Sequence, residues 1–173
     1  MIFLFKRTFF TCLLALCSVS VCCFCTKEDE KNQLATQSKN IDDFIKQDAT
    51  RVYSINGDTI ITIVHKKETN RIVWNPRTGD TLMRGDTVQF TYTGSIFRMG
   101  RGQIFAESSD RNVVGVGHYL PGLDAGLIGM RAGEYAYIMF TSEYGYGNKE
   151  FSVIPKMSPL MFEVEVLNIV KKK

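Results

Sequence analysis

Two segments of this chain alternate apolar and polar residues so regularly that little choice of secondary structure is left. In residues 86–93, Val88, Phe90 and Tyr92 are separated by Thr and Gln. In residues 160–166 one set of side chains alternates with the other: Leu160, Phe162, Val164 and Val166 against Met161, Glu163 and Glu165. A period of two predicts strands that each bury one face. We expect the first-named set of residues 160–166 to point inward and the second set outward.

In one segment the spacing of apolar residues changes from a period of two to that of a helix. Leu120, Leu123, Leu127 and Met130 are spaced by three, four and three residues, which predicts one face of a short helix. Pro121 suits its first turn, where a missing N–H is tolerated. Two glycines, Gly126 and Gly129, are expected to let this helix approach a sheet closely. Residues 134–141 show no clean alternation, as in a strand buried on both faces. The fold class predicted is α+β: a curled antiparallel sheet wrapped around one short α-helix.

The main domain is expected to span residues 81–173, preceded by a lead-in segment at 41–80. Residues 41–49 suit a short helix. Asn56-Gly57 lies between two β-rich runs and predicts a hairpin turn. A further extended piece covers 71–74. We expect these extended pieces to pack on the main sheet or to pair at its edge.

The N-terminal residues 1–25 have the pattern of a secretory signal. Lys6 and Arg7 precede the apolar run 8–25, which contains all five cysteines of the 173-residue chain. An uncleaved membrane anchor is the alternative, because the run approaches bilayer-spanning length. The end of the run is similar to that of bacterial lipoproteins, and the following Lys-plus-acidic residues favour Cys25 as the lipidated residue. Cys22 and Cys23 stay open as alternatives. Residues 26–40 are polar and predict a flexible tether.

Several functional classes are disfavoured. A formal net charge of +3 with scattered basic residues argues against a nucleic-acid partner. The chain has neither a dinucleotide-binding glycine fingerprint nor a Gly-x-Ser-x-Gly elbow. His65 and His118 stand far apart, so we expect no metal, and no cofactor is expected either. An aromatic sheet domain remains, with a Tyr-Gly stretch at 143–147 before an apolar loop. That combination favours an apolar binding cleft.

Five motifs, in order over residues 84–170, resemble the FK506-binding-protein (FKBP) type of peptidyl-prolyl cis-trans isomerase. They read GDTVQFTYTG (85–94), GQIFAESS (102–109), VGVGHYLPGLDAGLIGMRAGE (114–134), SEYGYG (142–147) and VIPKMSPLMFEVEVL (153–167). Each motif is weak by itself, and their order makes the resemblance specific. It also extends to the isomerase lipoproteins of Bacteroidetes-type bacteria.

The resemblance implies an aromatic pocket between the sheet and the short helix. Carried over residue by residue, the catalytic positions are Tyr92, Phe105, Tyr146, Ile154 and Phe162. The substrate-binding positions are Val114, Tyr119, Leu120 and Leu123. The Tyr146 hydroxyl would donate to a substrate carbonyl, and the Ile154 backbone N–H would hold the bound peptide. Plain core packing explains Tyr92 and Phe162 equally well, because alternation already accounts for them.

The sequence departs from the family pattern at two pocket positions. Ala106 replaces an aspartate, and whether Glu107 takes its place stays open. Leu123 replaces a tryptophan, and the only tryptophan of the chain, Trp74, lies outside the matched region.

The expected protein is therefore a monomeric, exported prolyl isomerase. It would be held by a lipid at the bacterial outer membrane, on its periplasmic or surface face, and would assist the folding of proline-containing client proteins. The alternative is a catalytically weak binding or chaperone module with the same fold. The clients, the residue preferred before proline and the role of residues 41–80 are not specified by the sequence.

Overall fold

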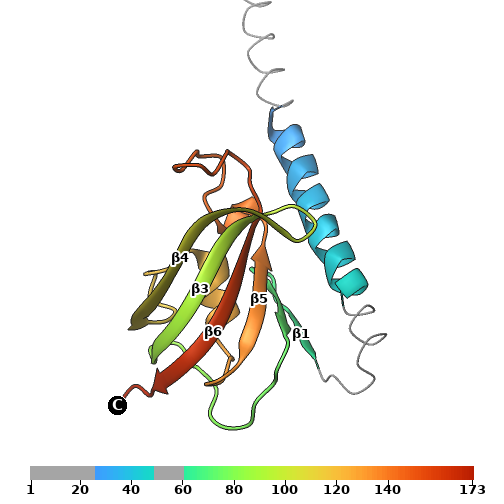
Figure 1. Cartoon of the computed structure of the whole chain (residues 1–173). Coiled ribbons are helices and arrows are strands. Elements are labelled where there is room, and N and C mark those ends of the chain that lie inside the picture. The colour runs from blue at the N-terminus through green and yellow to red at the C-terminus, as the bar shows by residue number, and fades with distance from the viewer. Residues whose placement is uncertain (1–25, 49–60) are drawn as a thin grey trace, which may run out of the picture. The chain divides into compact units, whose positions relative to one another are not determined.

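The computed structural model describes residues 26–48 and 61–173, and the contacts discussed below lie within residues 36–173. Its centre is a six-stranded antiparallel sheet in the order β1-β2-β5-β6-β3-β4 (Figure 1). The strands are β1 (Thr62–His65), β2 (Asn70–Val73), β3 (Thr87–Phe97), β4 (Arg101–Val113), β5 (Tyr135–Phe140) and β6 (Leu160–Val170). The helix α2 (Pro121–Leu127) and the 3-10 turn η1 (Ser142–Tyr144) complete the fold. The predicted antiparallel α+β class is confirmed.

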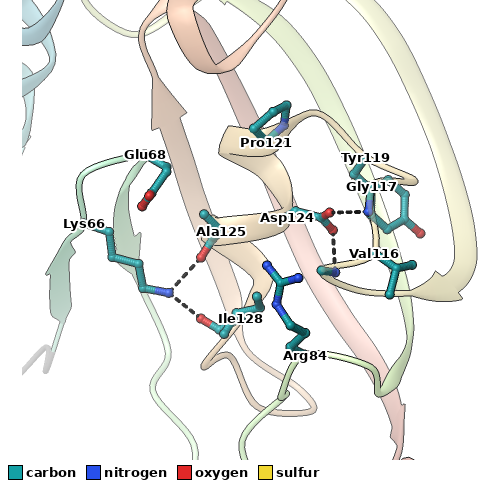
Figure 2. Close-up of a pocket in the computed structure, with 11 residues that line it drawn as sticks. Lys66, Glu68, Arg84, Val116, Gly117, Tyr119, Pro121, Asp124, Ala125 and Ile128 are labelled. Atoms are coloured by element: carbon teal, nitrogen blue, oxygen red, sulfur yellow. Dashed lines mark hydrogen bonds between the residues drawn. The ribbon is translucent and has the colours of Figure 1, made fainter.

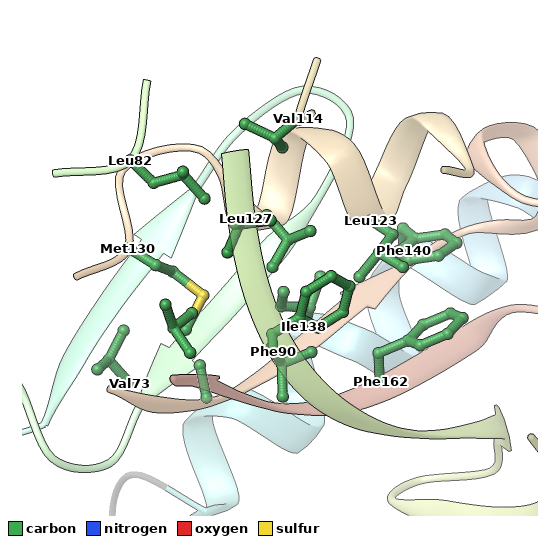
Figure 3. Packing of buried hydrophobic residues seen from close by; sticks show 14 of the residues in the cluster. Val73, Leu82, Phe90, Val114, Leu123, Leu127, Met130, Ile138, Phe140 and Phe162 are labelled. Carbon is green, nitrogen blue, oxygen red and sulfur yellow. The ribbon is translucent and has the colours of Figure 1, made fainter. Parts of the chain in front are cut away.

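One face of the sheet carries the main core (Figure 3). Leu160, Phe162, Val164 and Val166 of β6 all lie in it, as their alternation predicts. From α2, Leu123 and Leu127 pack on the same face, with Met130 just beyond the helix. The helix therefore covers the face that the sequence assigned to the interior, and a pocket between helix and sheet becomes possible.

The opposite face of the sheet is also covered. A second buried cluster brings Met139 and Met161 together with Ile72, Phe97 and two residues of the N-terminal helix, Ile41 and Ile45. The prediction that Met161 and Glu163 point away from the inward-facing set is confirmed, and neither side chain is exposed to solvent. Both side chains do leave the main core, but the helix buries Met161, and Arg101 pairs with Glu163, which is 6% exposed.

The N-terminal helix corrects two predictions at once. Residues 26–48 form a single α-helix, so residues 26–40 are not the tether predicted from their polar composition, and the helix expected at 41–49 begins much earlier. Ile41 and Ile45 lie one turn apart on its buried side. Within residues 26–48 and 61–173, no helix combines the length and apolar character needed to cross a membrane.

The lead-in segment extends the sheet, as predicted. β1 and β2 form an antiparallel hairpin, and β2 pairs with β5 along Asn70–Val73. The predicted Asn56-Gly57 turn lies outside the described residues, as do the signal segment 1–25 and Cys25.

Two glycines bring α2 close to β5. A Cβ at Gly122 would lie 2.2 Å from the Phe140 ring, and one at Gly126 would lie 2.3 Å from Ile138. The prediction for Gly126 is confirmed. Gly129 has a different role, since it lies beyond the helix with a φ of +91°, a conformation that favours glycine.

Candidate functional site

An aromatic pocket of about 430 Å³ opens where the start of α2 faces the sheet. It brings together seven of the nine residues predicted for the site, from five separate parts of the chain. These are Tyr92, Phe105, Tyr119, Leu120, Leu123, Tyr146 and Phe162. The walls are mostly rings and aliphatic side chains, which suits an apolar ligand with few polar anchors.

The back of the pocket is built on neighbouring strands. Phe162 of β6 stacks on Phe140, with ring centroids 5.8 Å apart, and meets Phe105 edge to face. Phe105 lies at a β-bulge, because Gly94 pairs with Ala106 while Ser95 pairs with Ile104. A bulge re-aims a side chain. Gly94 leaves the space this requires, since a Cβ there would lie 2.8 Å from the Phe105 ring.

The helix side of the pocket is held by Tyr119. Its ring packs edge to face on Phe90, and its hydroxyl donates a 2.9 Å hydrogen bond to Asp110 of β4. Burial and this carboxylate raise the pKa of Tyr119, so the hydroxyl stays protonated. Leu120 and Leu123 follow directly and complete this wall.

The rim of the pocket is formed by the loop between β5 and β6. Tyr146 projects from it and stacks on Phe151. Burial raises the pKa of Tyr146, which keeps its hydroxyl a donor at neutral pH. Among the described residues, the Tyr92 and Tyr146 hydroxyls have no hydrogen-bond partner, so both can serve a ligand.

Two predicted site residues lie elsewhere. Ile154 is buried in the main core and does not line the pocket, and its N–H donates a 2.9 Å bond to the Phe151 carbonyl in a tight turn. The expectation that this N–H holds a peptide is therefore wrong in this conformation. Val114 is likewise fully buried in the core, where the chain leaves β4, and forms no pocket wall.

The two departures from the family pattern both face the pocket. Ala106 and Leu123 line it, whereas Glu107 is exposed and does not. The open question about Glu107 is answered: it does not replace the missing aspartate. None of the lining residues carries a carboxylate, so the pocket presents apolar surface, tyrosine hydroxyls and the imidazole of His118.

Sequence reasoning missed three lining residues, His118, Pro121 and Phe151. His118 and Pro121 flank the predicted Tyr119 and Leu120, so their positions in the sequence could have indicated them. Phe151 belongs to the apolar loop that follows the Tyr-Gly stretch at 143–147. Its place beside Tyr146 depends on the tight turn to Ile154, which has no sequence signal beyond a short spacing.

A second cavity, of about 610 Å³, shares Tyr119 and Pro121 with the aromatic pocket (Figure 2). Two of its four charged side chains, Lys66 and Asp124, are hydrogen-bonded within the fold. Lys66 donates to the carbonyls of Ala125 and Ile128, both at 2.8 Å. Asp124 accepts from the N–H groups of Gly115 and Gly117, at 2.9 and 3.3 Å. These bonds hold both ends of α2, so this charged cavity supports the wall of the aromatic one.

Metal chemistry finds no support in the described part of the chain. There, no three His, Cys, Asp or Glu residues come together in a way that could hold a metal ion.

Known proteins share this architecture. The three FKBP domains of wheat FKBP73 match with a TM-score of 0.58 and 24% identity, over 66% of this chain and 52% of that one. This chain therefore spans about half of that three-domain protein, and the likeness shows the fold alone.

Sequence relatives are closer. FK506-binding protein 1A of Aspergillus fumigatus is 42% identical over 96 residues, which are 52% of this chain and 83% of that protein. A peptidyl-prolyl cis-trans isomerase of Schizosaccharomyces pombe is 39% identical over 95 residues, which are 51% of this chain and 82% of that protein. The sequence profile described as FKBP-type peptidyl-prolyl cis-trans isomerase matches residues 79–167, about half of the chain. The pocket, the fold and these matches together place the chain in the FKBP-type peptidyl-prolyl cis-trans isomerase family.

Proposed function

We propose that the aromatic pocket binds proline in an extended polypeptide and catalyses rotation about the preceding peptide bond. The observation that carries this proposal is the pocket itself: it is lined by Phe and Tyr rings, two of its tyrosine hydroxyls have no partner among the described residues, and no Asp, Glu, Lys or Arg lines it. Nucleophilic or carboxylate-dependent acid–base chemistry would need Ser, Cys, Asp or Glu side chains, and none of these lines the pocket. Bond rotation needs none.

The reaction is limited by amide conjugation. Rotation about a peptide bond meets a barrier of about 18–20 kcal/mol, because the C–N bond has partial double-bond character. In the planar ground state the carbonyl oxygen carries more negative charge than in the twisted transition state. A pocket that excludes water from that oxygen destabilises the ground state more than the transition state. Lowering the barrier by about 4 kcal/mol would accelerate the reaction about a thousandfold.

Tyr146 supplies the directional contact in this mechanism. Its hydroxyl has no partner among the described residues and borders the pocket on its rim. Donation to a substrate carbonyl would hold the segment beside the proline while the bond turns. Since the Ile154 N–H is engaged by Phe151, we assign this role to Tyr146 and Tyr92, whose hydroxyls have no partner among the described residues.

We further propose that the protein acts on exported proteins at a bacterial envelope, as the Bacteroidetes-type isomerase lipoproteins do. The support is the basic-then-apolar segment 1–25 and its cysteines near the end, with Cys25 before a Lys-plus-acidic run. The relatives named above are fungal, so this part of the proposal rests on the N-terminal sequence. Labelling with a radioactive fatty acid in a bacterial host tests it: the full chain should incorporate label and Cys25→Ser should not. Equal labelling of Cys25→Ser would exclude Cys25, and no labelling of either would exclude the lipid anchor.

The enzymatic proposal is tested by isomerisation of a short X-Pro peptide and by refolding of a protein limited by proline isomerisation. The full chain should accelerate both. Tyr146→Phe should lower kcat/KM about tenfold through the lost donor. Tyr144→Phe is the matched control, since that tyrosine lies in the same loop without lining the pocket. Unchanged activity in Tyr146→Phe would show that the rim hydroxyl has no part in the reaction.

The second candidate is a binding module that holds proline-containing segments without fast catalysis. Ala106 and Leu123 favour it, because they remove a carboxylate and a large ring from the family pocket. Binding of a proline peptide to the folded full chain, with no acceleration of either reaction, would establish this reading and overturn the enzymatic one.

A further inference from the structure

We propose that Gln37, in the N-terminal helix, is a positioning residue for the rim of the isomerase pocket. It holds together the two ends of the loop that carries Tyr146. This inference rests on the proposed function only in naming isomerisation as the activity that the rim serves. Gln37 lies outside the family-matched residues 79–167, so the helix would supply a part of the site that the family pattern does not contain.

Both halves of the Gln37 side-chain amide are used. Its Oε1 accepts a 2.8 Å hydrogen bond from the backbone N–H of Ser142, where the rim loop begins. Its Nε2 donates a 2.8 Å bond to the backbone carbonyl of Met157, where the loop ends. The side chain is buried, with only 8% of Gln37 exposed, and Ser142 is fully buried. Few polar side chains reach both a donor and an acceptor in this way, and glutamine can do so.

The loop closes the connection into a ring. The Ser142 carbonyl accepts from the N–H of Gly147 at 2.8 Å, and the Gly147 carbonyl accepts from the N–H of Met157 at 2.9 Å. Gln37, Ser142, Gly147 and Met157 are therefore joined in one closed circuit of hydrogen bonds. Tyr146 directly precedes Gly147, so the circuit fixes the backbone from which the rim tyrosine projects.

The N-terminal helix is packed against the sheet next to Gln37. Ile41 and Ile45 follow Gln37 at steps of four residues, on the same helix face, and both are buried against the sheet. Phe44 adds an edge-to-face contact with Phe97 at the end of β3. Gln37 is the polar end of this apolar stripe, and a single exchanged side chain can test its effect without removing the helix.

Loss of the amide would leave the Ser142 N–H and the Met157 carbonyl without their protein partners in a buried place. Buried groups of this kind are almost always paired, so the loop would shift to find water or another partner. Catalytic positions are sensitive to displacements of about 1 Å. The expected consequence is a misplaced Tyr146 in a domain that is otherwise folded.

The experiment compares three variants of the full chain. Gln37→Leu removes both bonds at similar size. Gln37→Glu keeps the acceptor and loses the donor when ionised. Lys39→Ala is the control, because Lys39 is exposed on the same helix and, among the described residues, pairs with Asp43 alone. The readouts are kcat/KM in an uncoupled X-Pro peptide assay and hydrogen exchange of the Ser142 and Gly147 amides.

Gln37→Leu should lower kcat/KM about tenfold and speed exchange of both amides by at least about tenfold, whereas Lys39→Ala should stay within about twofold of wild type. Gln37→Glu should recover activity relative to wild type as the pH falls from about 8 to 5, because a protonated carboxyl again offers one donor and one acceptor. A helix that was merely loosened would show no such recovery. The pH profile also keeps the test decisive if Gln37→Leu fails to fold.

Wild-type activity and exchange in a folded Gln37→Leu would overturn the inference. So would a Gln37→Glu variant whose activity relative to wild type is the same at every pH. If wild type itself accelerates no isomerisation, the proposed function fails, and exchange of the Ser142 and Gly147 amides alone decides whether Gln37 holds the rim.

Discussion

The ring of Tyr146 stacks on the ring of Phe151, with centroids 4.5 Å apart and planes 7° from parallel. Phe151 is 54% exposed, so this stack is a surface feature of the rim and contributes little to the core. Aromatic pairs contribute about 0.5–1.5 kcal/mol beyond the area they bury. Phe151→Ala should therefore raise KM for a proline peptide about three- to tenfold and leave kcat and the melting temperature nearly unchanged.

The control for this prediction is Val153→Ala, which trims an exposed apolar side chain of the same loop that does not line the pocket. Equal KM values for wild type and Phe151→Ala would show that Phe151 does not contact the substrate.

Restoring the family carboxylate should strengthen the site. Ala106→Asp places an acceptor on the pocket wall that also carries Tyr92, whose hydroxyl has no partner among the described residues. We expect kcat/KM to rise several-fold, with tighter binding of an FK506-type ligand and a stability loss of about 1 kcal/mol from burying a polar group. Glu107→Gln is the control, since that side chain is exposed. Unaltered activity and ligand binding would mean that the missing carboxylate at Ala106 limits neither catalysis nor ligand affinity.

Gly126→Ala should have two effects of opposite sign on the stability of the fold. Alanine is better in a helix by about 1 kcal/mol, which alone would stabilise the variant. However, the new Cβ would lie 2.3 Å from Ile138, and overpacking typically costs about 1–3 kcal/mol. We expect a net loss in the free energy of unfolding, measured by urea denaturation. A more stable variant would show that α2 can move away from β5.

The lead-in hairpin should stabilise α2 through Lys66. Its ammonium donates to two carbonyls at the end of the helix, which carries no basic residue of its own in the last turn. Lys66→Met should lower the free energy of unfolding by about 1–3 kcal/mol, as expected for hydrogen bonds to a charged group. The neighbouring Lys67 is exposed and makes no such bond, so Lys67→Met should change stability by less than about 0.5 kcal/mol. Similar losses of unfolding free energy in both variants would indicate that the positive charge matters, and not the hydrogen bonds of Lys66.

Acid sensitivity should depend partly on Asp86. The Lys171 ammonium, with the N–H groups of Lys172 and Met83, holds the pKa of Asp86 at about 2. Because this folded-state pKa is below the ordinary value of 3.8, the unfolded chain takes up the proton first as the pH falls. The contribution is therefore complete above about pH 4 and lost as the pH approaches about 2. Unfolding curves measured across this range should fall more steeply for wild type than for Asp86→Asn or Lys171→Met. Parallel curves would contradict the assignment.

The spacing of apolar residues predicted the helix and the strands whose side chains are buried in a regular pattern. Strand β6 and helix α2 followed their periods, and the unbroken apolar run of β5 was correctly assigned to a strand covered on both sides, since Ile138 and Met139 are each fully buried. What covers the second side was not predictable from these patterns. The N-terminal helix has a polar, highly charged first half, and its buried residues are only a few among many exposed ones.

The family resemblance predicted the pocket, but the local backbone conformation decides which of the predicted residues line it. Ile154 was placed at the rim because its position in the sequence matched, but a turn with Phe151 engages its N–H and buries its side chain. Phe105 reaches the pocket because of a β-bulge. The bulge depends on how the strands pair, and no periodic pattern in the sequence indicates it. Such features follow from pairing across the sheet and are set by residues far away in the chain.

The pairing of β2 with β5 has a practical consequence for anyone who expresses this domain in isolation. A fragment cut at the family boundary, residue 79, would discard β1, β2 and the N-terminal helix. The outer hydrogen-bonding row of β5 would then be left as an open template, and Met139 and Met161 would face water. Bare edges of this kind recruit other chains. We therefore expect the smallest fragment that resists aggregation to be larger than the family-matched unit and to begin upstream of Gln37.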